Sequence, residues 1–225
     1  YAGKVLRDAH GYGLLSVTEI IQKSSNIGTA KIAVMMGKNR LYHTLRRFGF
    51  GERTGIQLPS ESRGLFRQPT DWDALSITRF PIGQGIACTP LQLVRAYCAL
   101  ANGGRLVPLR LVDRYEDPET GRIVPHPYGE APKTFLHEAT RDQLLAMLKL
   151  VTQQGGTATR AAIPGYAVAG KTGTSQKVKG GNYSSSDFFA TFVGFVPADR
   201  PAFVLLVTAD EPQGQHYGGT VAAPV

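Results

Sequence analysis

The stretch Val168-Ala169-Gly170-Lys171-Thr172-Gly173-Thr174-Ser175 decides the fold, because two motifs from unrelated folds overlap in it. Residues 165–172 fit G-x-x-x-x-G-K-[ST], a loop that cradles phosphates between a buried strand and a helix. Residues 171–173 fit K-T-G, a tripeptide that is carried on a strand. The residues on either side must therefore decide between a phosphate loop and a strand.

The flanking residues favour the strand. A phosphate loop requires a buried strand before its first glycine and a helix directly after its lysine. Here residues 161–164 make a poor strand, residues 166–169 are strand-like where the loop should lie, and Gly180-Gly181 follows in place of an amphipathic helix. Residues 204–210 do resemble a strand that ends in a magnesium-binding Asp, so a nucleotide-hydrolysing enzyme stays open as one alternative.

Capping patterns predict most of the helices. Ser16 and Glu19 form the capping-box pattern of a helix over 16–22. Thr89, followed by Pro90 and Gln92, begins a helix that should run to Ala101. Glycine stops and one further cap predict three more helices, at 26–36, at 41–48 and, with Thr140 as the cap, at 140–152.

The rest of the chain reads as loops and strands. Residues 63–79 are loop-like, and β-like residues 106–115 and 122–125 flank a turn at 117–121. The last third favours a strand at 166–174 and a hairpin of 188–196 with 202–208.

Helices first and strands last indicate an α+β fold, in which an antiparallel sheet packs against helices beside an adjoining all-helical region. We expect one incomplete domain over 1–225, divided into a helical part at about 1–104, a hairpin-bearing insert at about 105–132 and a helix-plus-sheet part at about 133–225. Both ends read as cut from something longer.

Composition narrows the function classes. The chain has 225 residues, 42% of them apolar, and a net charge of +8. Its Lys and Arg residues are scattered and are not interleaved with aromatic residues, so nucleic-acid binding is not expected. The longest apolar run, 203–207, is far too short to cross a bilayer. A membrane anchor would therefore have to lie outside this chain.

A second motif lies far upstream of K-T-G. Ser24-Ser25-Asn26 fits S-x-N at a helix start, and with residues 27–31 it resembles the second motif of class B penicillin-binding proteins, the division or elongation D,D-transpeptidases. Matching segments run through the rest of the chain, at 83–87, 89–93, 99–104, 156–158, 168–174, 192–197 and 217–224. The resemblance leans towards the division type, and it implies the fold shared by serine β-lactamases and penicillin-binding proteins.

The resemblance implies cross-linking of peptidoglycan stem peptides by serine acyl transfer, with binding of β-lactam antibiotics and no metal or organic cofactor. It places the protein at the periplasmic or extracellular face of the bacterial inner membrane. Its partners there would be cell-division or elongation membrane proteins.

The same resemblance assigns roles to site residues. Ser24 would relay a proton to the leaving D-alanine amine, and Asn26 would hold the lysine of the nucleophile motif. Lys171 would face Ser24 across the cleft as a cation. The hydroxyls of Thr172 and Thr174 would bind the donor carboxylate, the Thr174 backbone N–H would stabilise the oxyanion, and Gly173 would leave room for substrate along the strand.

One member of the motif set is absent. No Lys in the chain has a Ser three residues before it, so the nucleophilic Ser-x-x-Lys is expected before Tyr1. This fragment alone is therefore expected to be inactive. A β-lactam sensor or a serine β-lactamase relative remains the alternative to a transpeptidase.

Overall fold

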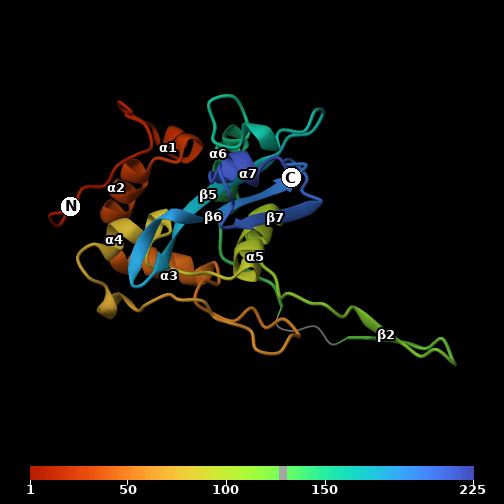
Figure 1. The fold of residues 1–225 in the computed structure, drawn as a ribbon. Helices are drawn as coiled ribbons and strands as arrows, with labels where there is room; N and C mark the ends of the chain where they lie inside the picture. The colour runs from red at the N-terminus through yellow and green to blue at the C-terminus, as the bar shows by residue number, and fades with distance from the viewer. Residues whose placement is uncertain (127–130) are drawn as a thin grey trace.

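A three-stranded antiparallel sheet forms the centre of the molecule (Figure 1). The computed structural model describes residues 1–126 and 131–225, so the expected insert at about 105–132 lies partly outside the described residues. The strands run in the order β5 (Ala169–Lys179), β6 (Asn182–Val196) and β7 (Phe203–Asp210). Helices pack around this sheet, which confirms the α+β fold class.

The first two helices meet at a sharp corner. α1 (Val17–Lys23) begins at Ser16, which forms the predicted capping box with Glu19. α2 (Asn26–Met36) begins only three residues after α1 ends, with Ser25 as its N-cap, and stops at Gly37 as predicted. The corner between the two helices therefore carries the Ser24-Ser25-Asn26 motif.

The remaining helical region contains short elements and loops. α3 (Lys38–Arg47) begins three residues earlier than predicted, directly after Gly37. The predicted loop at 63–79 is largely correct, although it holds a 3₁₀ turn, η1 (Pro69–Asp71), and one turn of helix, α4 (Ser76–Arg79), which continues into the 3₁₀ turn η2 (Phe80–Ile82). Asp73 starts α4 by accepting bonds from the Leu75 and Ser76 backbone N–H groups.

Two longer helices cover one face of the sheet. α5 (Pro90–Ala101) has the predicted Thr89–Gln92 capping box. α6 (Glu138–Val151) begins at Glu138, so the prediction that Thr140 caps this helix was wrong. His137 is the N-cap and makes no side-chain bond, and such a start leaves no signal in the sequence.

The apolar core lies on both faces of the sheet. On the α5–α6 face, Leu148 packs with Ala169 and Phe195. On the other face, Phe192 packs with Val168 and with the residues around the 3₁₀ turn η3 (Thr159–Ala161) and the short helix α7 (Gly218–Val221). Lys171 pairs with Val193 and shares the α5–α6 face with Ala169, because side chains alternate along a strand.

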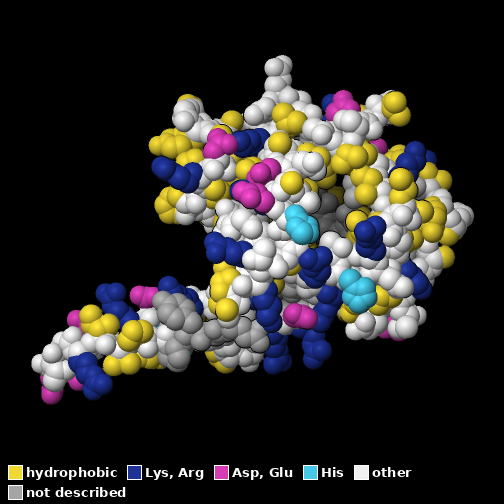
Figure 2. Space-filling model, turned by 180° about the vertical axis from the view of Figure 1, so that it is seen from behind, with side chains coloured by type: hydrophobic (Ala, Val, Ile, Leu, Met, Phe, Trp, Pro, Cys, Tyr) yellow, Lys and Arg dark blue, Asp and Glu magenta, His cyan; other side chains and the backbone are white. Residues whose placement is uncertain are grey.

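A narrow arm projects from this body (Figures 1 and 2). Its described part holds the hairpin of β2 (Arg114–Glu116) and β3 (Ile123–Pro125), closed by a turn at 117–121 as predicted. At its base β1 (Arg105–Leu106) pairs with β4 (Lys133–Thr134). Among the described residues, no helix has both the length and the apolar character needed to cross a bilayer.

Candidate active site

The structure brings Ser24 and Lys171 together across 147 residues of sequence. The Lys171 Nζ donates a hydrogen bond of 2.7 Å to the Ser24 Oγ. Lys171 extends from β5, and Ser24 lies at the corner between α1 and α2. Because the lysine occupies the acceptor side of the hydroxyl, the Ser24 O–H proton remains free to be donated to another group.

The environment of Lys171 lowers its proton affinity. Its ammonium also donates to the Thr172 carbonyl at 3.2 Å, and the side chain is half-buried between the strand and the helical wall. Burial lowers the pKa of Lys171 from 10.5 to about 8, because the charged form loses hydration. At neutral pH Lys171 is therefore mostly charged, yet it can lose its proton at moderate cost.

Ser24 adopts a backbone conformation that is unusual for a serine. It caps the C-terminus of α1 with φ 56° and ψ 45°, in the left-handed region. Glycine is the usual residue there, and a side chain costs about 1–2 kcal/mol. A residue with a hydroxyl therefore occupies a position where local structure favours glycine, which points to a requirement for the side chain itself.

A carboxylate outside the predicted motif braces the corner. Asp8 accepts a bond from the Ser25 Oγ at 2.9 Å and another from the Ile27 backbone N–H at 3.0 Å. Ser25 is buried and also accepts from the Gly28 N–H at 2.9 Å. These bonds satisfy the first N–H groups of α2 and hold the chain on both sides of Asn26.

Asn26 lies beside Ser24 in sequence but bonds elsewhere. Its amide Nδ2 donates to the Arg7 carbonyl at 3.1 Å. Its side-chain oxygen accepts no hydrogen bond from the described residues and so keeps both lone pairs for a further donor. The expected role of Asn26 towards a lysine outside this chain is untested and remains a prediction.

Thr172 and Thr174 occupy the opposite face of β5 from Lys171. The Thr172 Oγ1 lies 2.7 Å from the Thr157 Oγ1, and the Thr174 Oγ1 accepts from the Gly218 N–H at 3.0 Å. The Thr174 hydroxyl proton is therefore still available for a ligand. β5 pairs only with β6 in the described sheet, so its other edge is free.

The backbone along this free edge is accessible to a ligand. The Thr172 carbonyl accepts a hydrogen bond from the Lys171 ammonium at 3.2 Å. The backbone groups of Thr172 and Thr174 point in the same direction, because backbone direction alternates along a strand. The expected role of the Thr174 N–H as an oxyanion donor stays a prediction.

Gly173 is required by the neighbouring strand. A Cβ at this position would come within 2.3 Å of the Thr191 Oγ1 on β6. The Thr191 hydroxyl thus fills the space beside Gly173. This contact is a reason for the glycine that the K-T-G motif alone did not suggest.

Three site residues escaped the sequence reasoning. Thr157 lies in the segment 156–158 that resembles the family but was given no role, and neither Asp8 nor Thr191 lies in any of the matching segments. All three act through contacts with residues distant in sequence. The matching segment at 156–158 offered a signal for Thr157 only.

The structure excludes the phosphate-loop alternative. Residues 169–179 form one continuous strand, so Lys171 and Thr172 lie within β5 and are not followed by a helix. Residues 163–166 form only an isolated bridge. Without a strand–loop–helix unit, the backbone N–H groups cannot converge on a phosphate.

Helices around an antiparallel sheet, with serine and lysine facing each other beside a free strand edge, define the class of penicillin-recognising serine enzymes. A family model described as the penicillin binding protein transpeptidase domain matches residues 4–225. The chain belongs to this family, on its class B branch.

Similar proteins cover nearly the whole chain. It is 38% identical to stage V sporulation protein D of Bacillus subtilis over 96% of its length, and 36% identical to the peptidoglycan D,D-transpeptidase FtsI of Escherichia coli over 99%. These matches cover 33% and 36% of the two relatives. The structure superposes on penicillin-binding protein 3 of Mycobacterium tuberculosis, solved with aztreonam, with a TM-score of 0.90, 34% identity and coverage of 99% of this chain and 52% of that one.

Proposed function

We propose that this chain forms part of a D,D-transpeptidase that cross-links peptidoglycan stem peptides by serine acyl transfer. The observation that carries the proposal is the hydrogen bond between Lys171 and Ser24 at the free edge of β5. Family membership supports it, and so do the relatives whose names state this activity. The β-lactam sensor and β-lactamase alternatives are not favoured by these relatives.

In this proposal the nucleophile is a serine supplied by polypeptide outside these 225 residues. Acyl transfer needs an activated hydroxyl, a proton route to the leaving amine and donors for the oxyanion. Asn26 offers an unoccupied amide oxygen to the lysine of the Ser-x-x-Lys motif. The nucleophile would then lie between the S-x-N corner and β5.

Ser24 and Lys171 provide the proton route. The serine transfers its free O–H proton to the departing D-alanine amine, and it recovers a proton from the nucleophile side. The Lys171 cation, held 2.7 Å away, stabilises negative charge that develops on the Ser24 oxygen during this exchange. Its pKa near 8 keeps that cation largely present at neutral pH.

The free edge of β5 binds the donor peptide. The Thr174 hydroxyl and the Thr172 hydroxyl donate to the terminal carboxylate of a D-Ala-D-Ala donor or of a β-lactam. The Thr174 N–H provides one oxyanion donor, and the N–H of the external serine provides the other. Both threonine hydroxyls are pre-oriented by their contacts with Thr157 and Gly218.

Membership of this family also supports a proposal about the cellular setting. We place the working protein at the periplasmic or extracellular face of the inner membrane, with cell-division or elongation membrane proteins as partners. Co-purification of the membrane-extracted protein with division proteins, but not with elongation proteins, is expected for the division type.

The test uses a longer polypeptide that carries both this chain and a Ser-x-x-Lys segment. It should gain one acyl mass with benzylpenicillin and release D-alanine from a stem-peptide thioester. The 225-residue chain alone, the matched control, should gain no mass. Rapid hydrolysis of penicillin by the longer polypeptide would favour a β-lactamase, and an adduct on the 225-residue chain would mean that the nucleophile is misplaced.

A further inference from the structure

A cavity of about 440 Å³ lies beside the end of the β5–β6 hairpin. Three cationic side chains line it, from Lys4, Arg67 and Arg79, against a single carboxylate, from Asp73. Leu75 and Phe80 form an apolar part of the cavity wall. An excess of cations inside a concave site selects for a ligand that carries negative charge.

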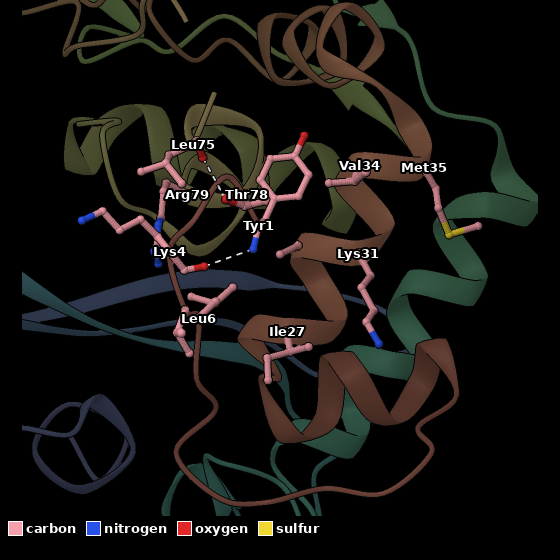
Figure 3. Close-up of a pocket in the computed structure, with 12 residues that line it drawn as sticks. Tyr1, Lys4, Leu6, Ile27, Lys31, Val34, Met35, Leu75, Thr78 and Arg79 are labelled. Carbon is pink, nitrogen blue, oxygen red and sulfur yellow. Dashed lines mark hydrogen bonds between the residues drawn. The ribbon is translucent and has the colours of Figure 1, made fainter. Parts of the chain in front are cut away.

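Two of these cations are uncommitted. Among the described residues, neither the Lys4 ammonium nor the Arg79 guanidinium has an ion-pair or hydrogen-bond partner. Figure 3 shows the two side chains beside each other, with Lys31 pointing out from another side of the adjoining cavity of about 650 Å³. Both also line the smaller cavity, so their charges act at one place.

The single carboxylate of the cavity does not neutralise them. One oxygen of Asp73 accepts three bonds at the start of α4, from the Leu75 N–H, the Ser76 N–H and the Ser76 Oγ. Arg67 is attracted to Asp73 and also lies over the Phe80 ring at 5.7 Å. Three cations against one carboxylate leave an excess of positive charge in the cavity.

In another basic region of the molecule, cationic side chains are bound to partners within the protein. A cavity of about 500 Å³ at the base of the arm, where Figure 2 shows Lys and Arg side chains gathered, is also rich in cations. There Arg46 pairs with Glu52, Arg47 donates to the Phe135 carbonyl, and Arg95 donates to the Val107 carbonyl at 2.8 Å. Those guanidinium groups hold the fold together and are not free for a ligand.

The hairpin adds a neutral donor to the smaller cavity. Tyr183 on β6 accepts a bond from the Gly85 N–H at 3.1 Å, which leaves its own O–H proton available. Tyr183 pairs with Val178 on β5, one pair before the Lys179–Asn182 pair that ends the ladder beyond Lys171.

The cavity continues the proposed cleft. Lys4 is three residues from Arg7, whose carbonyl holds Asn26, a span of at most about 10 Å. Val178 is seven residues from Lys171, about 23 Å along β5. An extended peptide of about six or seven residues covers that length. A substrate can therefore contact both the Ser24–Lys171 pair and the cationic cavity.

We propose that the cavity lined by Lys4, Arg67, Arg79 and Tyr183 binds a carboxylate of the second stem peptide, the one whose amine accepts the acyl group. This rests on the proposed function and extends it to the acceptor. The terminal carboxylate of the donor is bound at Thr172 and Thr174, so an acceptor carboxylate needs separate cations. Arg79 is the central residue, since a guanidinium binds a carboxylate through two parallel hydrogen bonds.

Equilibrium binding to the 225-residue chain tests this without any nucleophile. The probe is an unreactive stem peptide, compared with the same peptide after amidation of all its carboxylates. Amidation should weaken binding at least tenfold, and Arg79→Gln should weaken binding of the free peptide at least tenfold. Arg40→Gln, the matched control at an exposed position on α3, should change it less than twofold.

Equal affinity for the two peptides, or an equal loss in the Arg40→Gln control, would overturn the assignment. Inorganic phosphate that displaces the peptide at the same concentration would also overturn it, because the cavity would then be a general anion site. A failure of the proposed function itself would instead appear as absent acylation in the unaltered protein.

Discussion

At the scale of single residues, the site depends on a serine in an unfavourable backbone conformation. Ser24 occupies the left-handed region at the end of α1, where glycine would cost less. Its hydroxyl nevertheless accepts a hydrogen bond from the Lys171 ammonium. Stability therefore favours glycine at position 24, whereas the proposed function requires the serine hydroxyl.

Replacing Ser24 separates these demands. Ser24→Gly relieves the left-handed strain and should raise the free energy of unfolding by up to about 1 kcal/mol. In the longer polypeptide it should also lower penicillin acylation at least tenfold, because the proton relay is lost. Urea unfolding and acyl-mass kinetics measure the two effects. Ser24→Ala is the control, since it loses the hydroxyl but keeps the strain, and it should reduce acylation without gaining stability.

In the proposed mechanism, the pKa of Lys171 should make acylation decline at alkaline pH. Burial lowers its pKa to about 8, so the cation is present below that value and is lost above it. Penicillin acylation by the longer polypeptide should therefore fall as the pH rises through about 8. Lys171→Ala should lower acylation at least tenfold at pH 7, about 1.4 kcal/mol of transition-state stabilisation.

Lys171→Arg supplies the control for this pH profile. Arginine stays charged throughout the range, so the decline near pH 8 should disappear, whatever the absolute rate. A decline that persists in this variant would assign the titration to another group. The unfolding free energy gives a second readout: the charged lysine costs stability below about pH 8, and that cost vanishes as the pH rises towards 10.5.

At the scale of elements, the close pairing of β5 and β6 sets the geometry of the binding edge. Gly173 lies opposite Thr191, and the Thr191 hydroxyl fills the space that a side chain at 173 would need. Gly173 does not have a positive φ, so its backbone conformation is also open to alanine. Only the contact with the Thr191 hydroxyl opposes a side chain at this position.

Gly173→Ala should therefore destabilise the chain by about 1–3 kcal/mol, the usual cost of overpacking. Thr191→Ala removes the opposing hydroxyl, and the double variant should recover most of the lost stability. Thermal or urea unfolding of the two single variants and the double variant measures the coupling. Additive effects in the double variant would show that the Thr191 hydroxyl is not the opposing group.

The elements also show what could be predicted locally. The Ser16–Glu19 and Thr89–Gln92 capping boxes predicted α1 and α5. Such caps can be recognised in the sequence because the two partners are only three residues apart. The start of α6 at Glu138 could not be predicted, since His137 makes no capping bond. β5 runs on to Lys179 through exposed polar residues, and no apolar alternation marks this extension.

At the scale of the whole molecule, the contact that joins Ser24 and Lys171 could not follow from local patterns. Periodicity and caps predict elements, whereas this hydrogen bond depends on how the α1–α2 corner packs against an edge strand 147 residues away. The resemblance of both motifs to one family supplied that expectation. Asp8 and Thr191 match no motif and emerged only from the folded arrangement.

The most direct test follows the protonation of Lys171 in the 225-residue chain. With lysine side chains isotopically labelled, the NMR signal of Lys171, assigned by its loss in Lys171→Met, should titrate with a midpoint near pH 8. Ser24→Gly should shift that signal. A midpoint near 10.5 together with no response to the change at Ser24 would mean that the two side chains do not meet, and the site described here would not exist.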